Sequence, residues 1–182
     1  MRVFFFVAFL ILNLFVRAQI LPSIIPLLKT MEIRKGQFEW NNATKIYYNN
    51  SSLKRLAGFA QSALSEASGY SLSAPTPALN GNSKFVQLLL DASVKTNAEG
   101  YVLEVTPNSV FIRANAENGL FYGLQTLAQL IPGKGNKITN AVFIEDEPRF
   151  QWRGMMMDAC RHIWSVDFIK KFIDQLAYHK LN

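Results

Sequence analysis

One short stretch gathers most of the side chains in this 182-residue chain that could do chemistry. It covers residues 152–162 and reads WRGMMMDACRH. Asp158 and Arg161 stand close enough for the carboxylate to orient the guanidinium, whose rigid fork of N–H donors suits adjacent hydroxyl groups. The same two residues could instead form an ion pair that only supports the fold. His162 beside them is more typical of a structural hydrogen-bonding group than of a catalyst.

Two other kinds of chemistry have little support in this stretch. A copper site on methionines 155–157 would need further soft or histidine ligands, and the chain has only His162 and His179. Cys160 is the only cysteine, so no disulfide within the chain and no cysteine-based zinc site is expected, and few bases could activate it as a nucleophile. We therefore predict no metal site and no cofactor. We expect Trp152 and the methionines to pack in a core.

The elements that must position these residues are a strand and a helix. Residues 152–158 are nearly continuous in apolar side chains, which is typical of a strand buried on both faces. Residues 165–182 carry apolar side chains at helical spacing behind a Ser165 N-cap. A buried strand followed by a helix is the repeating unit of a parallel α/β fold, and one unit alone cannot close a barrel.

The preceding residues, 20–146, predict a small α+β domain. Helical spacing of apolar residues predicts helices over 52–68 and 117–131, and β-branched or alternating segments predict four strands. The predicted strands cover residues 44–50, 84–91, 100–105 and 109–114. This order favours a mainly antiparallel sheet with the helices on one face. Two prolines predict an extended entry segment over 20–40, and the acidic pairs within 145–147 predict a solvated turn.

The N-terminus predicts export. Arg2 precedes an apolar run over residues 3–16, and Ala18 offers a small residue for cleavage, so residues 1–19 are typical of a secretory signal peptide. An uncleaved membrane anchor is disfavoured because a spanning helix needs roughly 20 apolar residues. We expect a periplasmic or extracellular protein that meets the membrane only through its targeting signal.

The charge of the chain gives little support to nucleic-acid binding. The formal net charge is +6, and removal of Arg2 and Arg17 leaves 17 basic against 13 acidic residues, or +4. The basic residues are scattered, with no block interleaved with aromatics.

Three motifs in order resemble the β-N-acetylhexosaminidases of glycoside hydrolase family 20. They are NGLFYGLQTLAQLI (118–131), EDEPRFQWRGMMMDACRH (145–162) and FIKKFIDQLAYHKLN (168–182). The resemblance is strong over residues 117–182 and weak before them. It implies a small α+β domain followed by a (β/α)8 TIM barrel, of which 147–182 would be the first strand and helix before the sequence ends.

The resemblance also implies roles for the residues that opened this section. Arg161 would contact hydroxyls of the non-reducing sugar, Asp158 would support it, and His162 would lie in a second layer. Family 20 enzymes use the substrate's own 2-acetamido oxygen as nucleophile, with an Asp-Glu pair after a later barrel strand. The acidic pairs within 145–147 precede the first strand and cannot be that pair, so no catalytic residue is expected within these 182 residues.

We therefore expect an N-terminal fragment, inactive by itself, of an exported enzyme. Its substrates would be amino-sugar glycans or chitooligosaccharides with terminal non-reducing β-linked N-acetylglucosamine or N-acetylgalactosamine. Two alternatives stay open. One is another polysaccharide-degrading barrel glycosidase with a similar preceding domain, which the residues after Asn182 would reveal. The other is a non-enzymatic exported α+β binding domain, which a soluble, cooperatively folding 20–182 product would favour.

Overall fold

The structure is a computed structural model, and it describes residues 22–77, 83–133 and 137–182. The predicted signal peptide, residues 1–19, lies outside the described residues. Within the three described ranges, no helix is long and apolar enough to cross a membrane.

The small domain is built on one six-stranded sheet in the described part of the chain. In order across the sheet the strands are β1 (Thr30–Glu39), β6 (Ile138–Asp146), β4 (Tyr101–Val105), β5 (Ser109–Ala114), β3 (Phe85–Leu90) and β2 (Lys45–Tyr48). Strands β2 to β5 fall where the sequence predicted them. The outer strand β1 lies in the predicted extended entry segment, and β6 was not predicted.

The sheet is mixed. Its β1–β6, β6–β4 and β4–β5 pairs are antiparallel, in line with the mainly antiparallel sheet that was expected, whereas β2–β3 and β3–β5 are parallel. A tight turn joins β4 to β5, which suits an antiparallel pair. The connection from β2 to β3 includes a long helix, and a crossover of that length lets the two strands run parallel.

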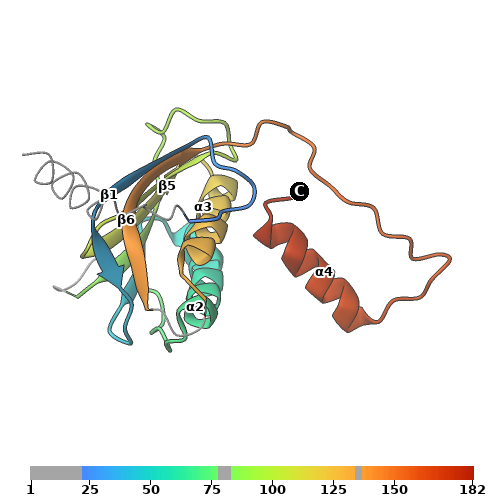
Figure 1. Ribbon diagram of the computed structural model, residues 1–182, viewed down its shortest axis with the longest axis horizontal. Coiled ribbons are helices and arrows are strands. Elements are labelled where there is room, and N and C mark those ends of the chain that lie inside the picture. The colour runs from blue at the N-terminus through green and yellow to red at the C-terminus, as the bar shows by residue number, and fades with distance from the viewer. Residues whose placement is uncertain (1–21, 78–82, 134–136) are drawn as a thin grey trace, which may run out of the picture.

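Two helices cover one face of this sheet (Figure 1). A 3₁₀ turn, η1 (Ser51–Leu53), leads into α2 (Lys54–Ser68), and α3 (Glu117–Leu130) follows β5. The Asn50 side chain accepts a hydrogen bond from the Ser52 backbone N–H at the start of η1, and Gly69 ends α2 with φ of 74° in the left-handed region. Both helices confirm the sequence prediction.

The core lies between the sheet and these helices. Alternate residues of β5 are fully buried, and the predicted apolar stripe of α3 is buried against them. The stripe consists of Leu120, Leu124, Leu127 and Ile131. Trp40 is also buried, and its indole N–H donates to Thr139 Oγ1 at 2.9 Å, so burial leaves no polar atom of the ring unsatisfied.

Residues 147–182 leave the small domain and return to it. Residues 147–165 have no regular secondary structure, and α4 (Val166–Tyr178) leads the chain back (Figure 1). The helix begins as predicted, with Ser165 Oγ accepting from the Phe168 N–H at 3.2 Å. The predicted strand over 152–158 pairs with no other strand among the described residues. A strand needs such a neighbour because its backbone N–H and C=O groups form hydrogen bonds with an adjacent strand rather than within the strand itself.

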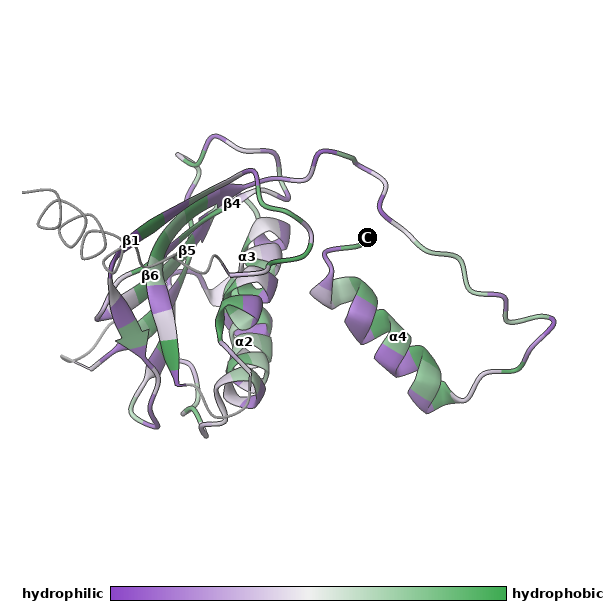
Figure 2. Ribbon diagram, viewed as in Figure 1, coloured by the Kyte–Doolittle hydropathy of each residue, from purple (hydrophilic) through white to green (hydrophobic). Residues whose placement is uncertain are grey.

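The expected core packing is wrong in this structure for Trp152, Met155 and Met156, while Met157 is half-buried. Trp152 is 94% exposed, Met156 is 97% exposed, and Met155 is also exposed. These side chains lie on the segment that pairs with no strand among the described residues. Figure 2 shows hydrophobic residues along this segment and alternating hydrophobic and hydrophilic residues along α4.

Candidate functional site

Asp158 and Arg161 form a compact turn on the segment before α4. Asp158 Oδ1 accepts from the backbone N–H groups of Cys160 and Arg161, each at 3.0 Å, and its Oδ2 accepts from Arg161 Nε at 2.5 Å. These backbone and side-chain hydrogen bonds from Arg161, with that from Cys160, lower the pKa of Asp158. The carboxylate therefore stays charged and holds the guanidinium, which fits both interpretations that the sequence left open.

The guanidinium of Arg161 keeps free donors. Its side chain is 90% exposed, and among the described residues only Nε has a protein partner. The two terminal nitrogens can therefore donate to a ligand, and their planar fork suits two adjacent hydroxyl groups.

An aromatic stack adjoins this turn. Trp164 Nε1 donates to the Asp158 backbone carbonyl at 3.0 Å, and the Trp164 ring stacks on Phe168 with centroids 4.4 Å apart. The His162 ring packs against Trp164 with centroids 4.5 Å apart, so it adjoins the Asp158–Arg161 turn, and among the described residues it bonds to neither of these side chains. Sequence reasoning missed Trp164, although a tryptophan so close to the Arg-His pair is a usable signal.

The predicted solvated turn at residues 145–147 is wrong for Asp146. This residue ends β6 and is only 7% exposed, because the backbone of β6 carries it under the returning C-terminal segment. Glu147 does lie near the surface and pairs with Lys29 at 2.7 Å. Asp146 is instead the centre of a buried polar cluster that no local pattern predicted.

We call this cluster the inner clasp: Asp146, Lys180, Tyr101 and Thr126. Lys180 Nζ lies 2.9 Å from Asp146 Oδ2 and donates to the Tyr101 hydroxyl at 2.8 Å. Tyr101 donates to Asp146 Oδ2 at 2.8 Å and shares a hydrogen bond with Thr126. Asp146 Oδ1 accepts from the Lys29 backbone N–H at 3.0 Å, so every polar side-chain atom of the cluster has a partner.

Burial and charge act against each other in the inner clasp. Burial, with the nearby Asp146 carboxylate, raises the pKa of Tyr101 well above its ordinary value, so the phenol keeps its proton and donates. Burial alone would raise the pKa of Asp146, but the Lys180 ammonium, with hydrogen bonds from Lys29 and Tyr101, lowers it. Burial lowers the pKa of Lys180, and Asp146 offsets part of that effect.

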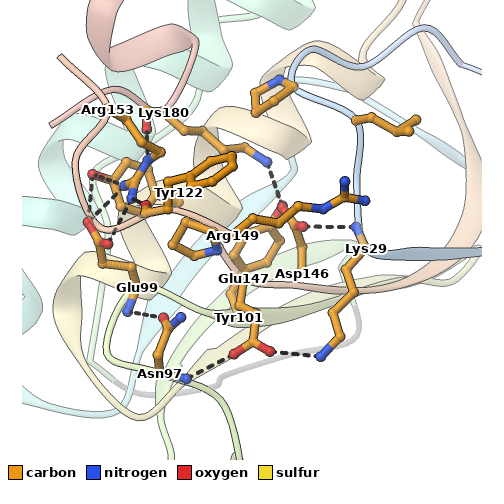
Figure 3. Close-up of a pocket in the computed structure, with 14 residues that line it drawn as sticks. Lys29, Asn97, Glu99, Tyr101, Tyr122, Asp146, Glu147, Arg149, Arg153 and Lys180 are labelled. Carbon is orange, nitrogen blue, oxygen red and sulfur yellow. Dashed lines mark hydrogen bonds and ion pairs between the residues drawn. The ribbon is translucent and has the colours of Figure 1, made fainter.

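The outer clasp is Glu99, Tyr122, Arg153 and Asn182 (Figure 3 draws the first three). Arg153 binds Glu99 with both terminal nitrogens, at 2.9 and 3.1 Å, and the Tyr122 hydroxyl donates to the same carboxylate at 3.2 Å. The hydrogen bond from Arg153 lowers the pKa of Glu99 despite partial burial. This two-point geometry is the strong form of an arginine–carboxylate pair.

The C-terminal unit, residues 153–182, is also closed on itself. The Asn182 N–H donates to the Arg153 carbonyl at 2.9 Å, and Asn182 Oδ1 accepts from the Arg153 N–H at 3.0 Å. Arg153 Nε donates to the Lys180 carbonyl at 2.9 Å. The two ends of the unit are therefore joined to each other at the place where both clasps bind them.

Lys180 holds a backbone conformation that favours glycine. It follows α4 with φ of 60°, and the Leu181 and Lys180 N–H groups bond the carbonyls of Leu176 and Ala177, at 2.8 and 3.0 Å. These two bonds form a Schellman motif, whose left-handed position is usually glycine. A Cβ in this left-handed conformation destabilises the backbone by about 1–2 kcal/mol, so lysine is less favourable here than glycine would be.

A cavity of about 630 Å³ lies beside the clasps (Figure 3). Its lining is Pro26, Leu27, Lys29, Asn97, Glu99, Tyr101, Tyr122, Asp146, Glu147, Pro148, Arg149, Phe150, Arg153 and Lys180. Most of its charged groups are already paired: Arg153 with Glu99 and Lys180 with Asp146 across the joint between the small domain and the C-terminal unit, and Lys29 with Glu147 beside it. In the part of the chain that the structure describes, no three His, Cys, Asp or Glu side chains are grouped as metal ligands.

Two family models match this chain. One is glycosyl hydrolase family 20, domain 2, over residues 21–147, and the other is glycosyl hydrolase family 20, catalytic domain, over residues 150–182. The first match alone covers more than half of the chain.

Similar proteins include a β-hexosaminidase of Porphyromonas gingivalis strain W83, 34% identical over 169 residues, which are 88% of this chain and 22% of that protein. The fold is similar to the family 20 β-N-acetylhexosaminidase of Streptomyces coelicolor, with a TM-score of 0.76, 31% identity and coverage of 87% of this chain and 33% of that one. It is also similar to the Streptomyces plicatus N-acetyl-β-hexosaminidase in complex with Thio-NAglucal, with a TM-score of 0.75, 30% identity and coverage of 92% and 34%.

The chain thus spans about a fifth of the length of the Porphyromonas relative. Its small domain and its C-terminal unit match consecutive domains of the same enzymes, in the order that the three motifs predicted. The chain belongs to glycosyl hydrolase family 20.

Proposed function

We propose that these residues are the N-terminal part of an exported β-N-acetylhexosaminidase that removes terminal non-reducing β-linked N-acetylglucosamine or N-acetylgalactosamine. Residues 1–19 would direct export, 20–146 would form the small domain, and 147–182 would open a TIM barrel. Family membership supports this proposal, and β-hexosaminidase is the name of the Porphyromonas relative.

The Asp158–Arg161 turn is the observation that carries the proposal. A guanidinium held by a carboxylate, with both terminal nitrogens free, is suited to bind two adjacent sugar hydroxyls. The sugar would then be held for attack by its own 2-acetamido oxygen, an intramolecular step that removes much of the entropic barrier. The Asp-Glu pair that assists this step in the family would come from residues beyond 182.

The experiment replaces Arg161, the residue proposed to bind the sugar, in the complete enzyme, which runs from this small domain through a closed barrel. Arg161→Lys keeps the charge and loses the fork, so kcat/KM for an aryl N-acetyl-β-glucosaminide should fall roughly 10- to 100-fold. Arg55→Lys is the matched control, because Arg55 is exposed on α2 and has no ion pair among the described residues. Equal kcat/KM for Arg161→Lys and Arg55→Lys would contradict the binding role.

The 182 residues by themselves should show no turnover of the same substrate. Hydrolysis by this piece would show that it holds a catalytic pair, contrary to the proposal.

A further inference from the structure

Apolar packing contributes little to holding the C-terminal unit on the small domain. Helix α4 has no buried residue, and Phe168 and Ile173 on it are 42% and 55% exposed. One hydrogen bond, from Gln129 Nε2 to the Tyr178 carbonyl at 3.0 Å, joins α3 to the end of α4. Something other than a hydrophobic face must therefore fix the place of this unit.

The strongest contacts between the two parts are the clasps. Lys180 and Asp146 are the most deeply buried charges at the joint, with side chains 7% and 10% exposed. The Arg153–Glu99 pair lies beside them, with side chains 13% and 21% exposed. Such pairs demand exact partners, because a buried charge left alone is strongly unfavourable.

The two clasps bind both ends of the C-terminal unit. Arg153 opens the unit, Lys180 and Asn182 close it, and hydrogen bonds join these ends to each other. Arg161 lies between them, on the segment that carries no secondary structure of its own. Fixing the two ends therefore restricts where the Asp158–Arg161 turn can lie.

We propose that Asp146 and Lys180 are positioning residues for sugar binding, which hold the C-terminal unit on the small domain and thereby set the place of Arg161. The small domain is then a fixed template for the first unit of the barrel. The lysine in a left-handed backbone position supports this role, because glycine would suit the turn and only the ammonium explains a side chain there.

The first test follows docking of the unit in the 182-residue chain by amide hydrogen exchange. Lys180→Met leaves the Asp146 carboxylate buried without its cation, so protection of α4 and of the Arg153 and Asn182 amides should fall roughly 100-fold. Amides of β4 and β5 should keep their protection, because the core of the small domain is unchanged. Lys170→Met is the matched control, since Lys170 is exposed on the same helix and has no ion pair among the described residues.

Two further variants separate charge from shape. Lys180→Gly suits the left-handed backbone but lacks the ammonium, so it should lose protection as Lys180→Met does. Asp146→Asn combined with Lys180→Met removes both charges and keeps an acceptor for the Lys29 N–H, so it should recover most of the protection. Unchanged protection in Lys180→Met, or full protection in Lys180→Gly, would overturn the proposal.

The second test rests on the proposed function and uses the complete enzyme. Lys180→Met should lower kcat/KM for an aryl N-acetyl-β-glucosaminide, and Asp146→Asn should restore it in the double variant. In an Arg161→Ala background, Lys180→Met should have less than a third of that effect, because Lys180 acts through Arg161. Full additivity of the two losses would show that Lys180 acts elsewhere and would overturn the positioning role.

The two tests fail separately. A wild-type enzyme without turnover would contradict the proposed function. The hydrogen-exchange experiment would still decide whether the inner clasp holds the C-terminal unit on the small domain. An active enzyme with unaffected kcat/KM in Lys180→Met would sink the positioning role alone.

Discussion

Gly119 allows α3 to approach the sheet, and replacing it with alanine tests how closely the two must pack. It is a buried residue in the first turn of α3. A Cβ added at this position would overlap the Gly100 carbonyl oxygen and lie 2.8 Å from Ala114 Cβ. The first obstacle is backbone, which cannot rotate away, so the helix itself must move outward.

The magnitude follows from two opposing effects. Overpacking a well-packed site costs about 1–3 kcal/mol, and a backbone obstacle places Gly119→Ala at the upper end of that range. Alanine in place of glycine within a helix stabilises the folded state by about 1 kcal/mol, because alanine has the higher helix propensity. We expect the free energy of unfolding to fall by about 2 kcal/mol, which lowers the melting temperature by about 4–8 °C for a domain of this size.

The control lies in the neighbouring helix. A Cβ on Gly58 of α2 would meet nothing within 4 Å, so Gly58→Ala should raise the free energy of unfolding by about 0.5–1 kcal/mol. Urea unfolding can be followed by tryptophan fluorescence, because Trp40 is buried whereas Trp152 is already exposed. A Gly119→Ala chain as stable as Gly58→Ala would refute the close packing described for α3.

Three other predictions use the same unfolding assay. Asp146→Asn should lower the free energy of unfolding at neutral pH. Folding lowers the pKa of the Asp146 carboxyl, so the charged carboxylate stabilises the folded chain above its unfolded pKa, and this contribution is lost on acidification. The difference in free energy of unfolding between Asp146→Asn and wild type should therefore shrink as pH falls below about 4, and a difference constant with pH would contradict this. Leu103→Ala removes a fully buried side chain from the centre of the sheet and should cost about 2–5 kcal/mol, and a cost below about 1 kcal/mol would argue against a close-packed core. Lys84→Ala breaks an exposed pair with Glu39 at 3.4 Å and should cost less than about 1 kcal/mol, so a larger loss would show that surface pairs hold this fold.

The sequence predicted the elements that carry their own periodic pattern. Helix α3 has an apolar stripe at helical spacing, and β5 alternates over its whole length, so both were located to within a residue or two. The strands β1 and β6 were missed because what defines them is their pairing with each other. Their register joins residues 99 to 115 positions apart, from Glu39↔Ile138 to Thr30↔Glu145, and no local pattern shows such a pairing.

In the candidate site, too, local spacing predicted some contacts and missed others. Asp158 and Arg161 are three positions apart, so their ion pair could be predicted from spacing. Asp146 and Lys180 are 34 positions apart, and each looks like an ordinary surface residue in its own segment. Only the return of the chain after α4 buries them together.

The expectation for Trp152 was wrong because a doubly buried strand needs neighbours on both sides, and residues 152–158 pair with none among the described residues. An apolar run shows what a segment needs to bury. It does not show which residues cover it.

The most direct test of the proposed activity compares two substrates that differ only at the sugar's second carbon. We would measure initial rates of the complete enzyme on an aryl N-acetyl-β-glucosaminide and on the matching aryl β-glucoside. Because the proposed nucleophile is the 2-acetamido oxygen, the account predicts hydrolysis of the first substrate and, on the second, a kcat/KM lower by a factor on the order of 1,000 or more. Comparable rates on both substrates, or turnover of the glucoside alone, would contradict it.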